Sequence, residues 1–167
     1  MGYHHYWGKA EKDGLRYHLL PYHCLDVAAV GCLLLDPEKP FCKRLAKQLG
    51  IAPAHLQRWI TFSLCLHDIG KFAVVFQGQV TGLSDELIKP NGRKRYDERH
   101  DSLGYCLWRA EEGLRDRLEM EESCFSSSSN SRHSKSTLDV WMQSVTGHHG
   151  IPPNSSLNLA NYFDPQD

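Results

Sequence analysis

The chain has 167 residues, of which 41% are hydrophobic and 23% are charged, and its formal net charge is −1 at pH 7. This length suits one domain that buries a core without disulfides or metal staples, and the composition excludes a disordered chain and a membrane chain. The chain has no apolar run near the roughly 18 to 20 residues of a membrane span, and it has no secretion signal, so we expect a cytoplasmic protein. The near-zero charge is also unlike that of a stand-alone nucleic-acid binder, which usually carries a basic excess.

Apolar residues with helical spacing predict two helices in the first fifty positions. The first helix runs from Pro21 to Leu34, where an Asp-Pro pair stops it. The second carries Phe41, Leu45 and Leu49 at intervals of four, followed by a glycine that caps its end.

A third helix leads from an apolar stripe into two polar residues. Leu56, Ile60 and Leu64 form the stripe, and the next positions on the same face are His67 and Asp68. Both side chains are therefore predicted to point inward.

The second half of the chain also has a helical pattern, interrupted by two polar segments. Residues 78–99 are predicted to be a loop, and a helix follows that includes Leu103 and Leu114. The Ser-rich tract 123–136 is predicted to be a flexible loop, because it is too poor in apolar residues to pack. A last helix carries residues 138–145, so the fold class is all-α and one domain spans 1–167.

Histidines gather at the inward ends of two of these helices. His67 and Asp68 extend one apolar stripe, and His148 and His149 extend another. Buried ionisable groups need partners, and neutral imidazoles are frequent metal ligands, while a carboxylate can bridge two ions. A lone inward histidine is more often a hydrogen-bonded core residue, but this clustering favours a metal site.

The motif His-Asp-Ile-Gly-Lys-Phe at 67–72 resembles the HD superfamily of metal-dependent phosphohydrolases. It is most similar to the HD nuclease domain of the helicase-nuclease of type I CRISPR systems, subtype I-E. Residues 6–9, the stretch 18–30 with Tyr-His-Cys-Leu-Asp-Val, and Gly-His-His-Gly at 147–150 carry the same resemblance. It implies an HD-domain helical bundle with a metal site between helices.

The resemblance also implies roles for individual residues. Asp68 would bridge two ions, and His67, Asp68 and Lys71 would form the catalytic centre, with Lys71 beside the metals on a continuing helix. The cofactor would be one or two divalent transition ions, with Mn, Fe, Co or Ni favoured over Mg by a histidine-rich site. The implied metal ligands are His23, His67, Asp68, His100, His148 and His149.

Two positions depart from the family pattern. Relatives have a further aspartate in an Ala-Asp-Trp-like segment beyond the double histidine, and this chain has none, so we expect a C-terminally truncated domain with an impaired first metal site. Asp101 follows His100 where relatives more often have glycine.

The implied activity is hydrolysis of single-stranded DNA, which degrades foreign DNA in antiviral CRISPR interference. Expected partners are the single-stranded DNA substrate, a helicase domain of the parent protein and a CRISPR RNA-guided surveillance complex, with no membrane involved. Lys89, Arg93, Lys94 and Arg95 are candidate DNA contacts on a flexible loop, and a solvated loop is the alternative. Two other functions stay open: an HD phosphohydrolase acting on nucleotides, and a truncated, non-catalytic docking module for the surveillance complex.

Overall fold

The computed structural model describes residues 2–11, 16–89, 94–111 and 131–164. These residues are mostly helical with one small antiparallel sheet, which confirms the predicted helical fold. Within the single predicted domain, the contacts define two compact units: unit 1 is Met1–Asp68 with Val80–Ile88, and unit 2 is Ile69–Gln79 with Lys89–Asp167. None of the described helices is both long enough and apolar enough to cross a membrane.

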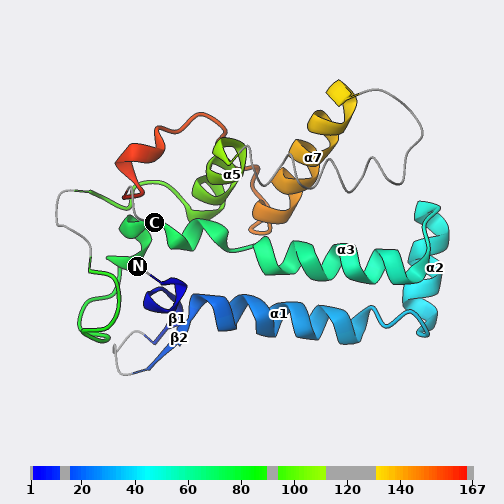
Figure 1. The fold of residues 1–167 in the computed structure, drawn as a ribbon, viewed down its shortest axis with the longest axis horizontal. Helices are drawn as coiled ribbons and strands as arrows, with labels where there is room; N and C mark the ends of the chain where they lie inside the picture. Colours follow the sequence, from blue (N-terminus) through cyan, green and yellow to red (C-terminus); the bar gives the residue numbers. More distant parts are fainter. Residues whose placement is uncertain (1, 12–15, 90–93, 112–130, 165–167) are drawn as a thin grey trace. The chain divides into compact units, whose positions relative to one another are not determined.

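Unit 1 is built on a pair of antiparallel helices, α1 and α3, with α2 at the end where the chain turns (Figure 1). Because the chain reverses between them, the start of α1 and the end of α3 lie at the same end of the pair. A two-stranded sheet leads directly into α1. The elements are η1 (Tyr3–His5), β1 (Trp7–Ala10), β2 (Tyr17–Leu19), α1 (Leu20–Leu34), α2 (Pro40–Leu49) and α3 (Pro53–Leu66).

A glycine lets α1 and α3 approach each other closely. A Cβ on Gly31 would lie 2.1 Å from the Cδ1 of Leu64, so a larger residue there would force the Leu64 side chain to move. Leu56 of α3 is 2% exposed and packs in a cluster that also holds residues of α2. These contacts fix the pair of helices that carries His23 and His67.

Helix α2 has the predicted C-terminal cap but buries a face that differs in part from the predicted one. Gly50 adopts a left-handed conformation (φ 68°) at its end, as the glycine was predicted to do. However, Phe41 is 55% exposed, and the buried residues are Cys42 and Ala46. Of the predicted stripe, Leu45 packs partly buried against this cluster, whereas Phe41 and Leu49 are more than half exposed.

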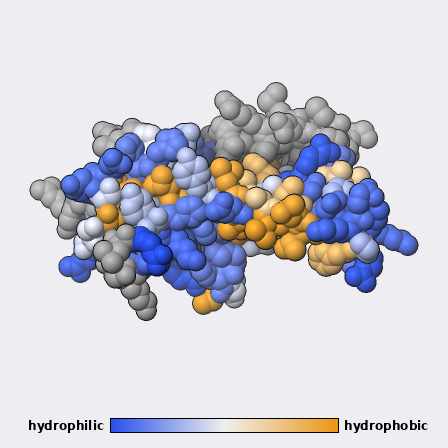
Figure 2. All heavy atoms as spheres, turned by 90° about the horizontal axis from the view of Figure 1, so that it is seen from below, coloured by the Kyte–Doolittle hydropathy of each residue, from blue (hydrophilic) through white to orange (hydrophobic). Residues whose placement is uncertain are grey.

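The surface of α1 carries several apolar side chains that the rest of the described chain leaves exposed. Leu25, Val30, Leu33 and Leu34 are 57%, 57%, 70% and 61% exposed. Figure 2 shows apolar residues gathered over this part of unit 1. This explains why α1 is apolar around most of its circumference although only one face is packed.

Unit 2 holds the remaining elements. Its core includes Leu103 and Trp108 from α5 and Leu138 and Met142 from α7, all at most 1% exposed. The two helices contact each other, and α5 also packs closely on η2. The elements are η2 (Ile69–Phe72), α4 (Val74–Gln77), α5 (His100–Ala110), α7 (Ser131–Thr146) and η3 (Leu159–Asn161).

The contact between η2 and α5 depends on two glycines that face each other. A Cβ on Gly70 would lie 1.8 Å from the carbonyl oxygen of His100 and 2.4 Å from the backbone nitrogen of Gly104. These are backbone atoms, which cannot rotate away as a side chain could. The glycine of the His-Asp-Ile-Gly motif therefore serves to seat the start of α5, where His100 lies.

Several segments differ from the sequence prediction. The β1–β2 hairpin was not predicted, because its strands have only four and three residues, lack a clear alternation, and β1 contains a glycine. Helix α7 begins at Ser131, so residues 131–136 are helical rather than part of the predicted Ser-rich loop. The rest of that tract, 123–130, and Leu114 lie outside the described residues.

Candidate metal centres

The first candidate centre is a triad of His23, His67 and Asp68 in unit 1. His23 is the fourth residue of α1, His67 is the C-terminal cap residue of α3, and Asp68 follows it. The Nε2 atoms of His23 and His67 lie 3.1 and 3.2 Å from the Oδ2 of Asp68, which is 2% exposed. The antiparallel pair of α1 and α3 thus brings together residues 45 positions apart.

The ring of His67 is held in one orientation by a backbone hydrogen bond. Its Nδ1–H donates to the carbonyl oxygen of Leu64 at 2.6 Å. A carbonyl can only accept, so Nδ1 carries a proton, and Nε2 is the ring nitrogen that faces Asp68 and would bind an ion. A backbone carbonyl in this position is a common outer partner of metal-binding histidines.

The second candidate centre is a triad of His100, His148 and His149 in unit 2. His100 is the first residue of α5, and the other two follow the end of α7. The Nε2 atoms of His100 and His149 are 3.1 Å apart, and the ring centroids of His100 and His148 are 5.9 Å apart. His100 was predicted to be a metal ligand although the residue after it departs from the family pattern. The structure places it beside His148 and His149.

The outer faces of this triad are also hydrogen-bonded. The Nδ1–H of His148 donates to the carbonyl oxygen of Val145 at 3.3 Å, which leaves its Nε2 free of the proton. The hydroxyl of Tyr96 lies 3.3 Å from the Nδ1 of His100 and accepts a bond of 3.0 Å from the backbone N–H of the same residue. Burial raises the pKa of the Tyr96 phenol.

Both triads have the donor chemistry and the spacing of metal sites. In each, one donor atom per residue lies within 4.8 Å of the others. Two nitrogens that each bind one ion at about 2.1 Å lie about 3.0 to 3.4 Å apart at angles of about 90° to 109°. The Nε2 separation between His100 and His149, 3.1 Å, fits this range. Imidazole-rich sets suit transition ions better than Mg²⁺.

The departure at Asp101 has a structural explanation. Its side chain is fully buried, forms an ion pair with Arg99, and accepts a hydrogen bond of 2.8 Å from the backbone N–H of Ser102. A carboxylate in the first turn of a helix is also favoured by the helix dipole. Asp101 therefore stabilises the start of α5, and the glycine that this packing requires stands at position 104.

Lys71 lies on η2 and not on a continuation of α3. Helix α3 ends at Leu66, and residues 69–72 form a separate 3-10 turn, so the continuing helix expected from sequence is absent there. The Nζ of Lys71 lies 5.5 Å from the ring centroid of Phe76, and its carbonyl accepts a hydrogen bond from Gln77. Its catalytic role is a proposal carried by the motif.

The four candidate DNA contacts are not equivalent. Lys89 and Arg95 are exposed, and Arg93 lies outside the described residues. Lys94 forms an ion pair of 2.6 Å with Asp164 and donates to the carbonyl oxygen of Phe163. Its charge is therefore partly neutralised by the C-terminal segment, a contact that sequence reasoning missed because 70 residues separate the two side chains.

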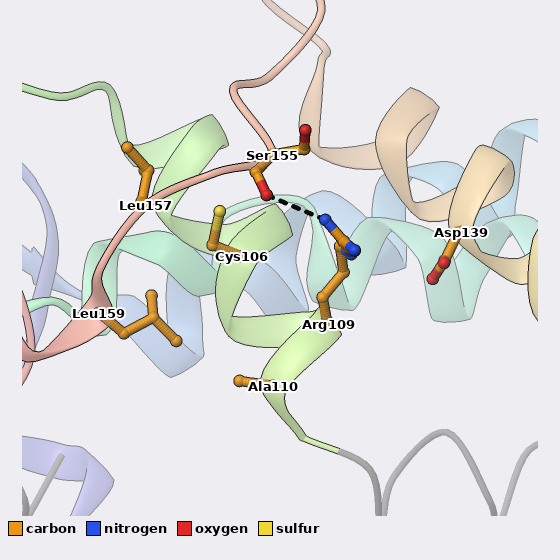
Figure 3. A pocket seen from close by; sticks show the side chains of 7 residues that line it. All are labelled: Cys106, Arg109, Ala110, Asp139, Ser155, Leu157 and Leu159. Atoms are coloured by element: carbon orange, nitrogen blue, oxygen red, sulfur yellow. Dashed lines mark hydrogen bonds between the residues drawn. The ribbon is translucent and has the colours of Figure 1, made fainter.

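A cavity of about 310 Å³ lies elsewhere in unit 2. Figure 3 shows it between α5, α7 and the segment near Ser155, whose carbonyl oxygen accepts a hydrogen bond of 2.9 Å from Arg109. No histidine of either triad lines it. This cavity therefore gives no support to a nucleotide pocket built around the candidate metal ligands. Its lining residues are Cys106, Arg109, Ala110, Asp139, Ser155, Leu157 and Leu159.

Comparisons with known proteins agree with the motif. The family model described as "Cas3, HD domain" matches residues 7–166. The chain is 31% identical over 160 residues to the "CRISPR-associated endonuclease/helicase Cas3" of Escherichia coli strain K12. This match covers 88% of the chain and 17% of that relative, so the chain spans about a sixth of the relative's length. No solved structure gives a significant match.

Proposed function

Because the chain belongs to the Cas3 HD-domain family, we propose that it is a metal-dependent nuclease domain that degrades DNA in CRISPR interference. The observation that carries the proposal is the pair of triads, which together contain all five histidines and the one aspartate expected as metal ligands. A packing role alone would not explain two separate sets of three such side chains, each with its donor atoms within 4.8 Å of one another.

The residues of each triad would each have a defined task. A divalent ion in such a site supplies a Lewis acid and lowers the pKa of a bound water, which is the chemistry that phosphodiester hydrolysis requires. His23 and His67 would hold one ion together with Asp68, and the second triad would hold another. We further propose that Asp68 bridges the two ions, as the motif implies.

Lys71 and the basic segment before α5 would act on the substrate. An ammonium group near the reacting phosphate stabilises the negative charge that builds up during hydrolysis, which is the role proposed for Lys71. The exposed side chains of Lys89 and Arg95 would contact the phosphate backbone of single-stranded DNA. Lys94 would contribute less, because Asp164 already pairs with it.

The proposed substrate and partners are those that the family resemblance implies. The Escherichia coli relative is described as an endonuclease and helicase. We therefore propose that a helicase domain delivers single-stranded DNA to this domain and that a guide-RNA surveillance complex recruits both. A net charge of −1 supports this division of labour, since the domain has no basic excess with which to hold DNA alone.

The test is cleavage of circular single-stranded DNA with Mn²⁺, Co²⁺ or Ni²⁺. The unaltered chain should nick the circle, and His67→Ala and Asp68→Ala should abolish nicking. The matched control is Asp26→Ala, which removes a carboxylate of α1 whose side chain is 72% exposed and should leave nicking unchanged.

Other results would replace the proposal. Retained nicking in Asp68→Ala would refute the assigned centre. Turnover of small nucleotides without DNA cleavage would identify a nucleotide phosphohydrolase. Absence of cleavage and of metal binding, with specific binding to the surveillance complex, would identify a docking module.

A further inference from the structure

We infer that a row of exposed aromatic rings beside the first triad binds the bases of single-stranded DNA by stacking. This inference rests on the proposed nuclease function and adds a substrate-binding surface to it. The surface lies within unit 1, where η1 and the β1–β2 hairpin contact the start of α1 (Figure 1). It consists of Tyr3, His4, His18 and Tyr22, which we call the ring row.

Each ring of the row lies next to another, although the rings come from three different elements. The ring centroids of Tyr3 and His4 are 4.0 Å apart, and those of His4 and Tyr22 are 6.4 Å apart. The ring centroids of His18 and Tyr22 are 6.5 Å apart, and the two rings are nearly parallel, with an angle of 11° between their planes. Thus η1, β2 and α1 together present one continuous aromatic surface.

The rings of the row are open to solvent, unlike the aromatic side chains of the core. Tyr3 is 59% exposed, Tyr22 is 50% exposed, and the side chain of His18 is 41% exposed. Tyr6 and Trp7, which follow η1 directly, are 4% and 5% exposed. Burial in the core therefore accounts for these two residues but not for the ring row, and exposed aromatic side chains that gather in one place indicate a binding surface.

The ring row leads directly to the first triad. The ring of His18 meets that of His23 edge-on at a centroid distance of 6.2 Å, and the ring centroids of His23 and His67 are 5.6 Å apart. Tyr22 also immediately precedes His23 in α1. A base stacked on Tyr22 would therefore lie beside the residues proposed to hold an ion, which is where a strand has to lie in order to be cut.

The charged groups beside the row favour contact with bases at the rings and with phosphates next to them. Lys9 is exposed and pairs with His18 across the hairpin, so the two side chains lie on the same face. Its ammonium group would attract the phosphate backbone. The carboxylate of Asp26 lies 3.6 Å from the Nε2 of His18 and would repel a phosphate there. The strand should therefore turn its bases to the rings and its backbone toward Lys9.

The chemistry of the row suits single-stranded nucleic acid. Stacking of bases on aromatic side chains, combined with basic groups along the backbone, is the usual way in which proteins hold single strands without sequence preference. The rings of the row carry phenol oxygens or imidazole nitrogens, whose polar edges can stay hydrated. The exposed Leu33 and Leu34 further along α1 have neither rings nor charge, so the ring row is chemically distinct from that apolar face.

Binding of two strands of equal length tests the inference. One strand is oligo(dT) and the other is abasic, so both carry the same charge but only the first has bases to stack. The full chain is titrated in the presence of EDTA, and fluorescence anisotropy reports binding without cleavage. The unaltered chain should bind oligo(dT) more tightly than the abasic strand. Tyr22→Ala should weaken binding of oligo(dT) about 5-fold to 150-fold and leave binding of the abasic strand unchanged.

Two variants control for effects other than stacking. Tyr22→Phe keeps the ring and should bind oligo(dT) as the unaltered chain does. Tyr17→Ala is the matched control, because Tyr17 is 37% exposed and precedes His18 in β2, so its side chain points to the opposite face of the hairpin. It should leave binding of both strands unchanged.

Photo-crosslinking of the unaltered chain tests the same surface without any substitution. A single strand that contains iodouracil should crosslink to the peptide with His18 and Tyr22, which mass spectrometry identifies. Crosslinks found only in other peptides would overturn the inference, and so would equal binding of the two strands by the unaltered chain. A loss of binding to the surveillance complex in Tyr22→Ala, with binding of both strands unchanged, would identify a protein contact instead.

The same experiments separate this inference from the proposed function. If Tyr22→Ala weakens binding of oligo(dT) as expected but no divalent ion supports cleavage by the unaltered chain, the ring row stands and the nuclease proposal fails. If the unaltered chain cleaves DNA and Tyr22→Ala binds oligo(dT) as tightly as the unaltered chain, only the ring row is refuted.

Discussion

Replacing Gly70 by alanine should destabilise the protein and weaken metal binding at the second triad, although the change adds a single methyl group. That methyl would lie 1.8 Å from the carbonyl oxygen of His100, 2.4 Å from the nitrogen of Gly104 and 2.8 Å from the carbonyl carbon of His100. All three are backbone atoms, so η2 and the start of α5 must separate. The displaced segment includes His100, the first residue of α5, so metal binding at the second triad should weaken together with stability.

The expected loss of stability is at the upper end of the range for overpacking. Inserting one methylene into a packed core typically costs about 1 to 3 kcal/mol, and we expect about 3 kcal/mol here because no side-chain rotation relieves the contact. Urea unfolding of the metal-free chain measures this change, and titration with Mn²⁺ measures the affinity.

The matched control is Gly2→Ala. A Cβ on Gly2 would meet no atom within 4 Å, and the backbone there has φ −90°, which alanine adopts readily. Its unfolding free energy should change by less than about 0.5 kcal/mol. If Gly70→Ala behaved like Gly2→Ala in both assays, the close seating of η2 on α5 would be refuted.

Two further predictions use paired variants. Leu56→Ala should lower the free energy of unfolding by about 2 to 5 kcal/mol, because the side chain is 2% exposed. Leu33→Ala, on the exposed face of α1, should change it by less than about 0.5 kcal/mol. Equal losses in urea unfolding would contradict the packing described for α1 and α3. Arg95→Gln should weaken binding of single-stranded DNA more than Lys94→Gln, because Lys94 pairs with Asp164; a larger effect at Lys94 in a salt-dependent binding assay would show that the pair opens on DNA.

Periodicity located the helices but could not decide which face of each is packed. In α2, Phe41 and Leu49 have the spacing of a buried stripe, yet both are more than half exposed, and Cys42 and Ala46 face α3. The reason is tertiary: small residues permit a closer approach than large ones, and the pattern within one helix does not reveal its neighbour.

The site was predictable where it follows from short-range pattern or from family resemblance. The inward position of Asp68 follows from the stripe of α3, and the structure places it at 2% exposure. The association of His23 with His67 depends on the antiparallel pairing of α1 and α3, which the resemblance implied and local pattern could not. The contacts of the Tyr96 hydroxyl with His100 were not predicted, because a single tyrosine in a polar segment does not indicate which residue of α5 it will meet.

The central claim is that each triad holds a divalent ion, and anomalous scattering from crystals grown with Mn²⁺ tests it most directly. The account predicts one anomalous peak among His100, His148 and His149, and a second peak among His23, His67 and Asp68 that is weaker because this sequence lacks the further aspartate of the first site. It also predicts that Asp26→Ala keeps both peaks. The claim would be contradicted if crystals of protein that cleaves DNA with Mn²⁺ lacked the peak at one triad or at both.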